Sequence, residues 1–141
     1  MAAPRLIPSR AVARWILALF YAAAGTIHLL APRPFVSITP GWVPDPPLVV
    51  ALTGVAEILG AIGLVQGVSP ALRRAAGWGL AAYALCVWPA NFNHMAIDMA
   101  SADGGLGLSY HLPRLVAQPL LIWLALWAGE VTQWPLRRHG G

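Results

Sequence analysis

The sequence predicts an all-α protein, a four-transmembrane-helix bundle with its N- and C-termini cytoplasmic. Of the 141 residues, 58% are hydrophobic and only 10% are charged, and the mean hydropathy is +0.65. Soluble domains rarely have this composition. The apolar residues gather in four segments, and about 20 helical residues are enough to cross a hydrocarbon layer of roughly 30 Å. The chain is short enough for the four segments to form a single domain.

Proline marks the limits of the four helices. Pro47 and Pro113 are suited to the first turn of a helix, where no amide donor is needed. Prolines recur through residues 32–47, so we expect a structured loop there, and Pro89 is expected to kink the third helix. The expected helices are about 15–31, 47–68, 72–96 and 113–131, in a membrane domain at 15–131 between a basic cytoplasmic N-terminus at 1–14 and a basic cytoplasmic tail at 132–141.

The arginines predict the orientation of the bundle. The net charge of +4 comes from arginine, because the sequence contains no lysine. Four crossings would place most of the arginines on one side: Arg5, Arg10, Arg14, Arg73, Arg74, Arg137 and Arg138 against Arg33 and Arg114. By the positive-inside rule, both ends are then cytoplasmic. The protein is expected to be a multi-pass protein of the cell inner membrane, with the lipid bilayer as a partner.

Other classes of protein are disfavoured. A basic start, an apolar run and small residues at 22–25 also fit a cleaved signal peptide, but the run continues to Leu30, which favours a retained first helix. No groove of interleaved basic and aromatic residues indicates nucleic-acid binding. Cys86 is the single cysteine, which excludes a disulfide framework, a Cys-x-x-Cys redox pair and a thiolate metal cluster. We predict no metal site.

Glu57 is the first candidate functional residue, because it lies near the middle of the second apolar segment. A carboxylate in a bilayer is costly unless it is protonated, paired or facing a wet cavity. Gly54, Gly60 and Gly63 recur on the same face, so Glu57 is expected to point into the bundle. The alternative is a protonated Glu57 that only holds helices together.

Polar residues of the other helices are expected at the outer half of the bundle, with an almost wholly apolar inner half. We predict a pocket open to the outer face, in which Glu57 and His28 are catalytic and exchange a proton, while the ligand-binding residues are Asn91, His94, Arg114 and Gln118. Asn91, His94 and Asp98 share one face if the third helix continues past Pro89. As alternatives, His28 is a core histidine or, less favoured, a haem ligand, Arg114 is a membrane-surface anchor, and His94 and His111 are loop or interface residues.

Five sequence segments together resemble the DoxX-like membrane proteins. They are Ala24-Gly25-Thr26-Ile27-His28, Pro40 with Pro44, Leu52-Thr53-Gly54-Val55-Ala56-Glu57-Ile58-Leu59-Gly60, Pro89-Ala90-Asn91-Phe92-Asn93-His94-Met95-Ala96 and Leu112-Pro113-Arg114-Leu115-Val116-Ala117-Gln118. The resemblance covers about residues 15–130 and implies a compact four-helix membrane bundle. The family takes its name from a small subunit of a sulfur-compound:quinone oxidoreductase.

Two functional hypotheses follow. In the first, the protein is a redox-associated subunit whose outward-facing polar pocket binds a quinone or similar apolar small molecule. Its electrons would come from a partner oxidoreductase, because the sequence has no cysteine pair and no flavin or nucleotide fingerprint. In the second, it is a non-enzymatic accessory, assembly or lipid-binding protein whose polar cluster fixes the helix register. Transport is less favoured, since the inner half offers no polar path. Homo-oligomers and catalysis itself are left open.

Overall fold

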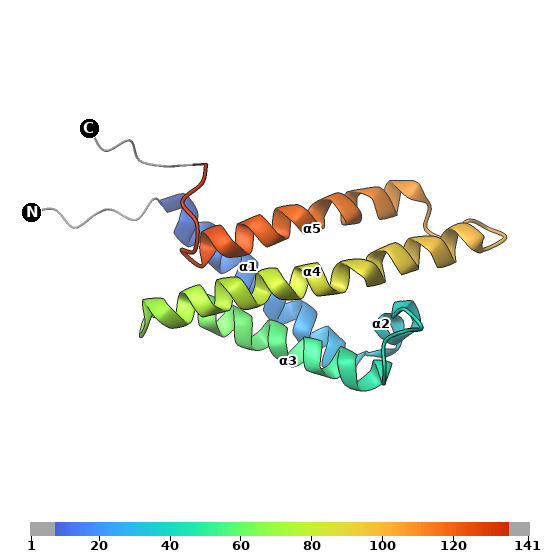
Figure 1. Cartoon of the computed structure of the whole chain (residues 1–141), viewed down its shortest axis with the longest axis horizontal. Helices are drawn as coiled ribbons and strands as arrows, with labels where there is room; N and C mark the ends of the chain where they lie inside the picture. Colours follow the sequence, from blue (N-terminus) through green and yellow to red (C-terminus); the bar gives the residue numbers. More distant parts are fainter. Residues whose placement is uncertain (1–7, 136–141) are drawn as a thin grey trace, which may run out of the picture.

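The computed structural model describes residues 8–135, and within this range the fold is all-helical, which confirms the all-α part of the predicted fold class. Four long helices pack side by side and a short helix covers one end (Figure 1). Helix α1 packs mainly against α3, α3 also packs against α4, and α4 packs against α5. The helices are α1 Pro8–Leu30, α2 Arg33–Ile38, α3 Pro46–Val65, α4 Pro70–Ala100 and α5 Leu108–Ala128.

The helix bounds differ from the expected ones where prolines are present. The expectation of a non-helical loop was wrong for α2, because Pro32 and Pro34 stand at its start, where the missing amide donors are not needed. Pro113 does not open its helix, since α5 already begins at Leu108. Helix α4 continues through Pro89 to Ala100, which puts the polar residues after Pro89 on regular helical spacing.

Glycines let α1 and α3 approach closely at one level. A Cβ atom added to Gly25 would lie 2.5 Å from the carbonyl oxygen of Gly54, and one added to Gly54 would lie 2.9 Å from the Cβ of His28. Because small residues bring two backbones together, this crossing also brings together the side chains beside it. Those side chains are His28 on α1 and Glu57 on α3.

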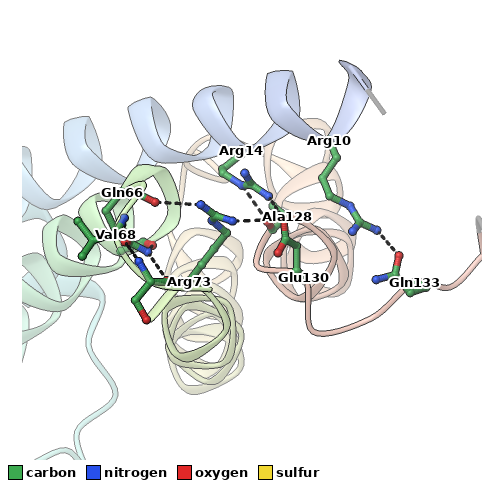
Figure 2. Close-up of polar contacts among 10 residues, drawn as sticks. Arg10, Arg14, Gln66, Val68, Arg73, Ala128, Glu130 and Gln133 are labelled. Atoms are coloured by element: carbon green, nitrogen blue, oxygen red, sulfur yellow. Dashed lines mark hydrogen bonds and ion pairs between the residues drawn. The ribbon is translucent and has the colours of Figure 1, made fainter. Parts of the chain in front are cut away.

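The end of the bundle where α1 begins and α5 ends contains a network of buried arginines, which we call the basic end (Figure 2). The Glu130 carboxylate accepts from Arg14 at 2.7 Å and from Arg73 at 3.3 Å. Arg10 donates to Gln133 at 2.9 Å and stacks over the Trp127 ring. Sequence reasoning did not find this network.

The loop end is the opposite end of the bundle, formed by α2 and by the α4–α5 connection (Figure 1). Arg33 and Arg114 belong to elements of this end, whereas Arg10, Arg14 and Arg73 lie at the basic end. The described arginines are therefore divided between the two ends as expected. Arg5, Arg137 and Arg138 lie outside the described residues.

An apolar core separates the two ends, and its largest members are Leu17, Tyr21, Leu64 and Leu80. Among the described residues, two helices are long and apolar enough to cross a membrane: Ser9–Leu30 and Pro46–Val65. Only 33% of each of these apolar windows is buried inside the bundle. Their outward faces are therefore mostly apolar surface.

Candidate functional site

A cavity of about 470 Å³ lies in the half of the bundle nearer the loop end. All five helices and the segment between α2 and α3 contribute to its lining. Its walls are mostly apolar, with side chains such as Phe20, Phe35, Trp42, Val50, Val87 and Leu121. Five of the six predicted site residues line it: His28, Glu57, Asn91, Arg114 and Gln118. These residues converge as expected, and their individual roles stay predictions.

His28 and Glu57 form a buried pair on the cavity wall. Nδ1 of His28 lies 2.8 Å from Oε2 of Glu57, and the two residues are 9% and 3% exposed. The atoms are within ion-pair distance but are not aligned for a hydrogen bond, and neither atom has another partner among the described residues. The Phe35 ring packs against the His28 imidazole in a T-shaped arrangement, with 3.9 Å between the ring centroids. The pair therefore lies on the cavity wall and is largely shielded from bulk solvent.

Two tyrosines complete this part of the wall and were missed by sequence reasoning. Tyr21 is 2% exposed, and its hydroxyl has no partner among the described residues. Tyr83 packs edge-on against Tyr21 and approaches the Glu57 carboxyl group. Their spacing could have revealed them. Tyr21 precedes His28 by two helical turns and Tyr83 precedes Asn91 by about two, so each tyrosine lies on the same helix face as a predicted site residue.

Arg114 gathers the polar side chains of α4 and α5. Its guanidinium group donates to Oδ1 of Asn91 at 2.7 Å, contacts Nδ1 of His94 at 2.9 Å and lies over the Tyr110 ring at 4.9 Å. The i, i+3 spacing of Asn91 and His94 on the uninterrupted helix makes this double contact possible. His94 does not line the cavity, but it contacts Arg114, which does. Gln118, 7% exposed, follows Arg114 by one turn and faces the cavity.

A second polar cluster lies beyond Arg114 at the loop end. Oδ2 of Asp98 lies 2.8 Å from Nε2 of His111 and 3.7 Å from Nε2 of His94. The backbone N–H of Leu106 and the His111 imidazole hold the pKa of the Asp98 carboxyl below its usual value. The expectation of a loop or interface position was wrong for His111, which is in the first turn of α5 and is fully buried, because α5 begins earlier than expected.

Fold and site together define a small all-helical protein with a mostly apolar cavity on which several polar side chains converge. A family model described as a domain of unknown function (DUF8561) matches residues 17–131. The chain therefore belongs to this family. No curated protein and no solved structure matches the chain.

Proposed function

We propose that the chain is a four-span membrane protein of the DoxX-like type that binds a quinone or similar apolar small molecule in its cavity, as a subunit of a redox system. The observation that carries this proposal is the convergence of His28, Glu57, Asn91, Arg114 and Gln118 on one mostly apolar cavity. Pockets for small molecules have this character, with apolar walls and a few converging polar groups. The volume of about 470 Å³ is in the usual range for such sites.

The exposed surface supports a membrane location for all four long helices. Large apolar side chains are exposed on α4 and α5 as well as on the two apolar helices, for example Trp78, Leu85 and Phe92 on α4 and Leu112, Val116 and Leu120 on α5. Apolar surface of this extent is unfavourable in water and favourable in lipid. With 31 and 21 residues, α4 and α5 are long enough to span, since a helix rises about 1.5 Å per residue.

The charge distribution supports cytoplasmic termini in the inner membrane. Four crossings bring both termini to one side, and the basic end contains Arg10, Arg14, Arg73 and Arg74. Arginine-rich ends stay preferentially in the cytoplasm. The cavity then lies in the outer half of the bilayer, separated from the cytoplasm by the apolar core and the basic end.

The polar groups of the cavity suit a ligand with carbonyl oxygens. Arg114 and Gln118 are hydrogen-bond donors on α5, while His28 and Glu57 offer a proton on the α1–α3 side. A quinone becomes a quinol by taking up two electrons and two protons. The electrons would come from a partner oxidoreductase, one proton would pass from the His28–Glu57 pair to a quinone oxygen, and solvent would supply the second proton and recharge the pair.

A binding titration on detergent-purified protein tests this proposal. Trp42 lines the cavity, so its fluorescence reports an added short-chain quinone. We expect saturable quenching in the wild type, its loss in Trp42→Phe, and at least about tenfold weaker binding in Glu57→Gln, which removes a buried acid next to the ligand. Asp103→Asn, in the α4–α5 connection, is the matched control and should bind as the wild type does. Quenching that does not saturate, or equal affinity in Glu57→Gln, would favour the accessory or lipid-binding role.

A further inference from the structure

We propose that His94, Asp98 and His111 form a binding site for a divalent transition-metal ion of the Zn²⁺ class at the loop end of the bundle. The three potential ligand atoms lie within 4.8 Å of one another. Two imidazoles and one carboxylate are a ligand set that suits Zn²⁺ and similar ions. This inference does not depend on which ligand the cavity binds.

The distances between the donor atoms are close to those of a bound site. Zn²⁺ lies at about 2.0–2.2 Å from nitrogen and oxygen ligands, so two ligand atoms of a tetrahedral site are roughly 3.3 Å apart. Here the two distances to Asp98 are 2.8 Å from His111 and 3.7 Å from His94. The two histidine ligand atoms lie no more than 4.8 Å apart, so they need to approach each other by up to about 1.5 Å, which side-chain rotation can supply.

The α4–α5 connection holds the carboxylate in place. Leu106 donates its backbone N–H to Oδ2 of Asp98 at 2.9 Å, and Gly105 packs so closely against the carboxylate that a Cβ there would collide with it. Positive φ angles at Gly104, Gly105 and Gly107 allow the tight return of the chain. Supporting contacts of this kind orient the ligands of metal sites.

Protonation of the two histidines also bears on binding. Both rings present Nε2 to the Asp98 carboxylate, and metal binding through Nε2 requires the proton of each neutral ring to be on Nδ1. Nδ1 of His111 is buried without a partner among the described residues, so it is free to accept the proton. Nδ1 of His94 is occupied by Arg114 at 2.9 Å. Arg114 therefore competes with the metal, and it can yield because it keeps its contact with Asn91.

An ion at this position would have an open coordination site. Three protein ligands leave a fourth tetrahedral position, which a water molecule can fill. The side chains of His94 and Asp98 are 18% and 14% exposed, so the ion can enter from this side, while His111 closes the site from within.

Titration of the purified, tag-free full chain with Co²⁺ tests the site, because Co²⁺ in a site of this kind absorbs visible light and Zn²⁺ should displace it. We expect saturation near one ion per chain, and affinity at least about tenfold lower in His94→Ala and Asp98→Asn. Both residues are partly exposed, so these variants should fold. Asp103→Asn and His139→Ala are controls for adventitious carboxylate and imidazole binding and should keep the wild-type affinity.

Arg114→Gln gives the opposite expectation. Removing the competitor of the metal should tighten Co²⁺ binding by up to about tenfold, the effect of one hydrogen bond to a charged group. The proposal is overturned if the wild type gives no saturable Co²⁺ spectrum, or if the His94 and Asp98 variants bind as the controls do. Unchanged or weaker Co²⁺ binding by Arg114→Gln would contradict the competition between Arg114 and the metal for His94.

Discussion

The proposed chemistry of the site depends most on one carboxylate, that of Glu57. Glu57 is 3% exposed in a largely apolar environment, and its Oε2 lies 2.8 Å from Nδ1 of His28. Removing one member of a buried pair leaves an uncompensated group, whereas removing both leaves none. The pair is therefore best studied by comparing single and double variants.

We predict that His28→Ala destabilises the protein by about 3–5 kcal/mol. The double variant His28→Ala/Glu57→Gln should recover part of this loss, because the unpaired carboxylate is gone. Thermal unfolding in a mild detergent measures both effects. A double variant that is less stable than His28→Ala would mean that Glu57 is stabilised by groups other than His28.

At the basic end, one carboxylate serves two arginines. Glu130→Gln should destabilise the protein by about 1–3 kcal/mol, because Arg14 and Arg73 lose the negative charge that they share and keep their carbonyl contacts with Ala128 and Gln66. Quinone affinity should stay at the wild-type value, since this end is remote from the cavity. Denaturant unfolding and the fluorescence titration test the two parts separately, and a loss of quinone affinity would contradict this separation.

At the scale of the elements, the crossing of α1 and α3 holds the site together. Glu57 on α3 and His28 on α1 meet because Gly25 and Gly54 let the two backbones approach. The crossing is a property of two glycines facing each other. A single glycine in either helix would not create it.

Gly54→Ala is predicted to push α1 away from α3, because its Cβ would lie 2.9 Å from both the Gly25 carbonyl oxygen and the His28 Cβ. We expect a lower unfolding temperature and weaker quinone binding together. Gly79→Ala is the matched control: it is also within a helix, nothing lies within 4 Å of the added Cβ, and alanine is the better helix former. Its stability should be unchanged or slightly higher. Equal effects of the two substitutions would contradict the close crossing.

Sequence reasoning found the elements and part of the site for physical reasons that can be named. Apolar segments of sufficient length reveal the long helices, and the spacing of Asn91 and His94 reveals their common face. The partners of Glu130 were not predictable, because Arg14 and Arg73 are 116 and 57 residues away in the sequence. The burial of His111 was missed because Pro113 was taken as the helix start. The contribution of α2 to the cavity wall was missed because helix propensity does not reveal how a short helix packs on the others.

At the scale of the whole molecule, the two ends of the bundle differ in charge and in the polar sites that they contain. The basic end is a closed network of arginines around Glu130, the middle is apolar, and the loop end contains the cavity and the cluster of His94, Asp98 and His111. If the bundle spans a membrane as proposed, this asymmetry determines its orientation.

The orientation can be tested with reporter fusions. A reporter that is active only in the cytoplasm should be active when fused after residue 141, and a reporter that is active only outside should be active when inserted after Asp103. Replacing Arg73 and Arg74 by glutamine weakens the basic signal on the cytoplasmic side, so it should lower the fraction of correctly oriented chains. The opposite pattern of reporter activity would contradict the proposed topology.

The central claim is that the cavity holds a quinone-like molecule, and the most direct measurement is made on protein purified in a mild detergent. Its UV–visible spectrum is recorded oxidised and reduced, and the organic extract is analysed by mass spectrometry. We expect a quinone in near-stoichiometric amount from the wild type and from Glu130→Gln, and its loss from Glu57→Gln. A featureless spectrum with only bulk phospholipid in all three extracts would contradict the account and favour a non-enzymatic accessory protein.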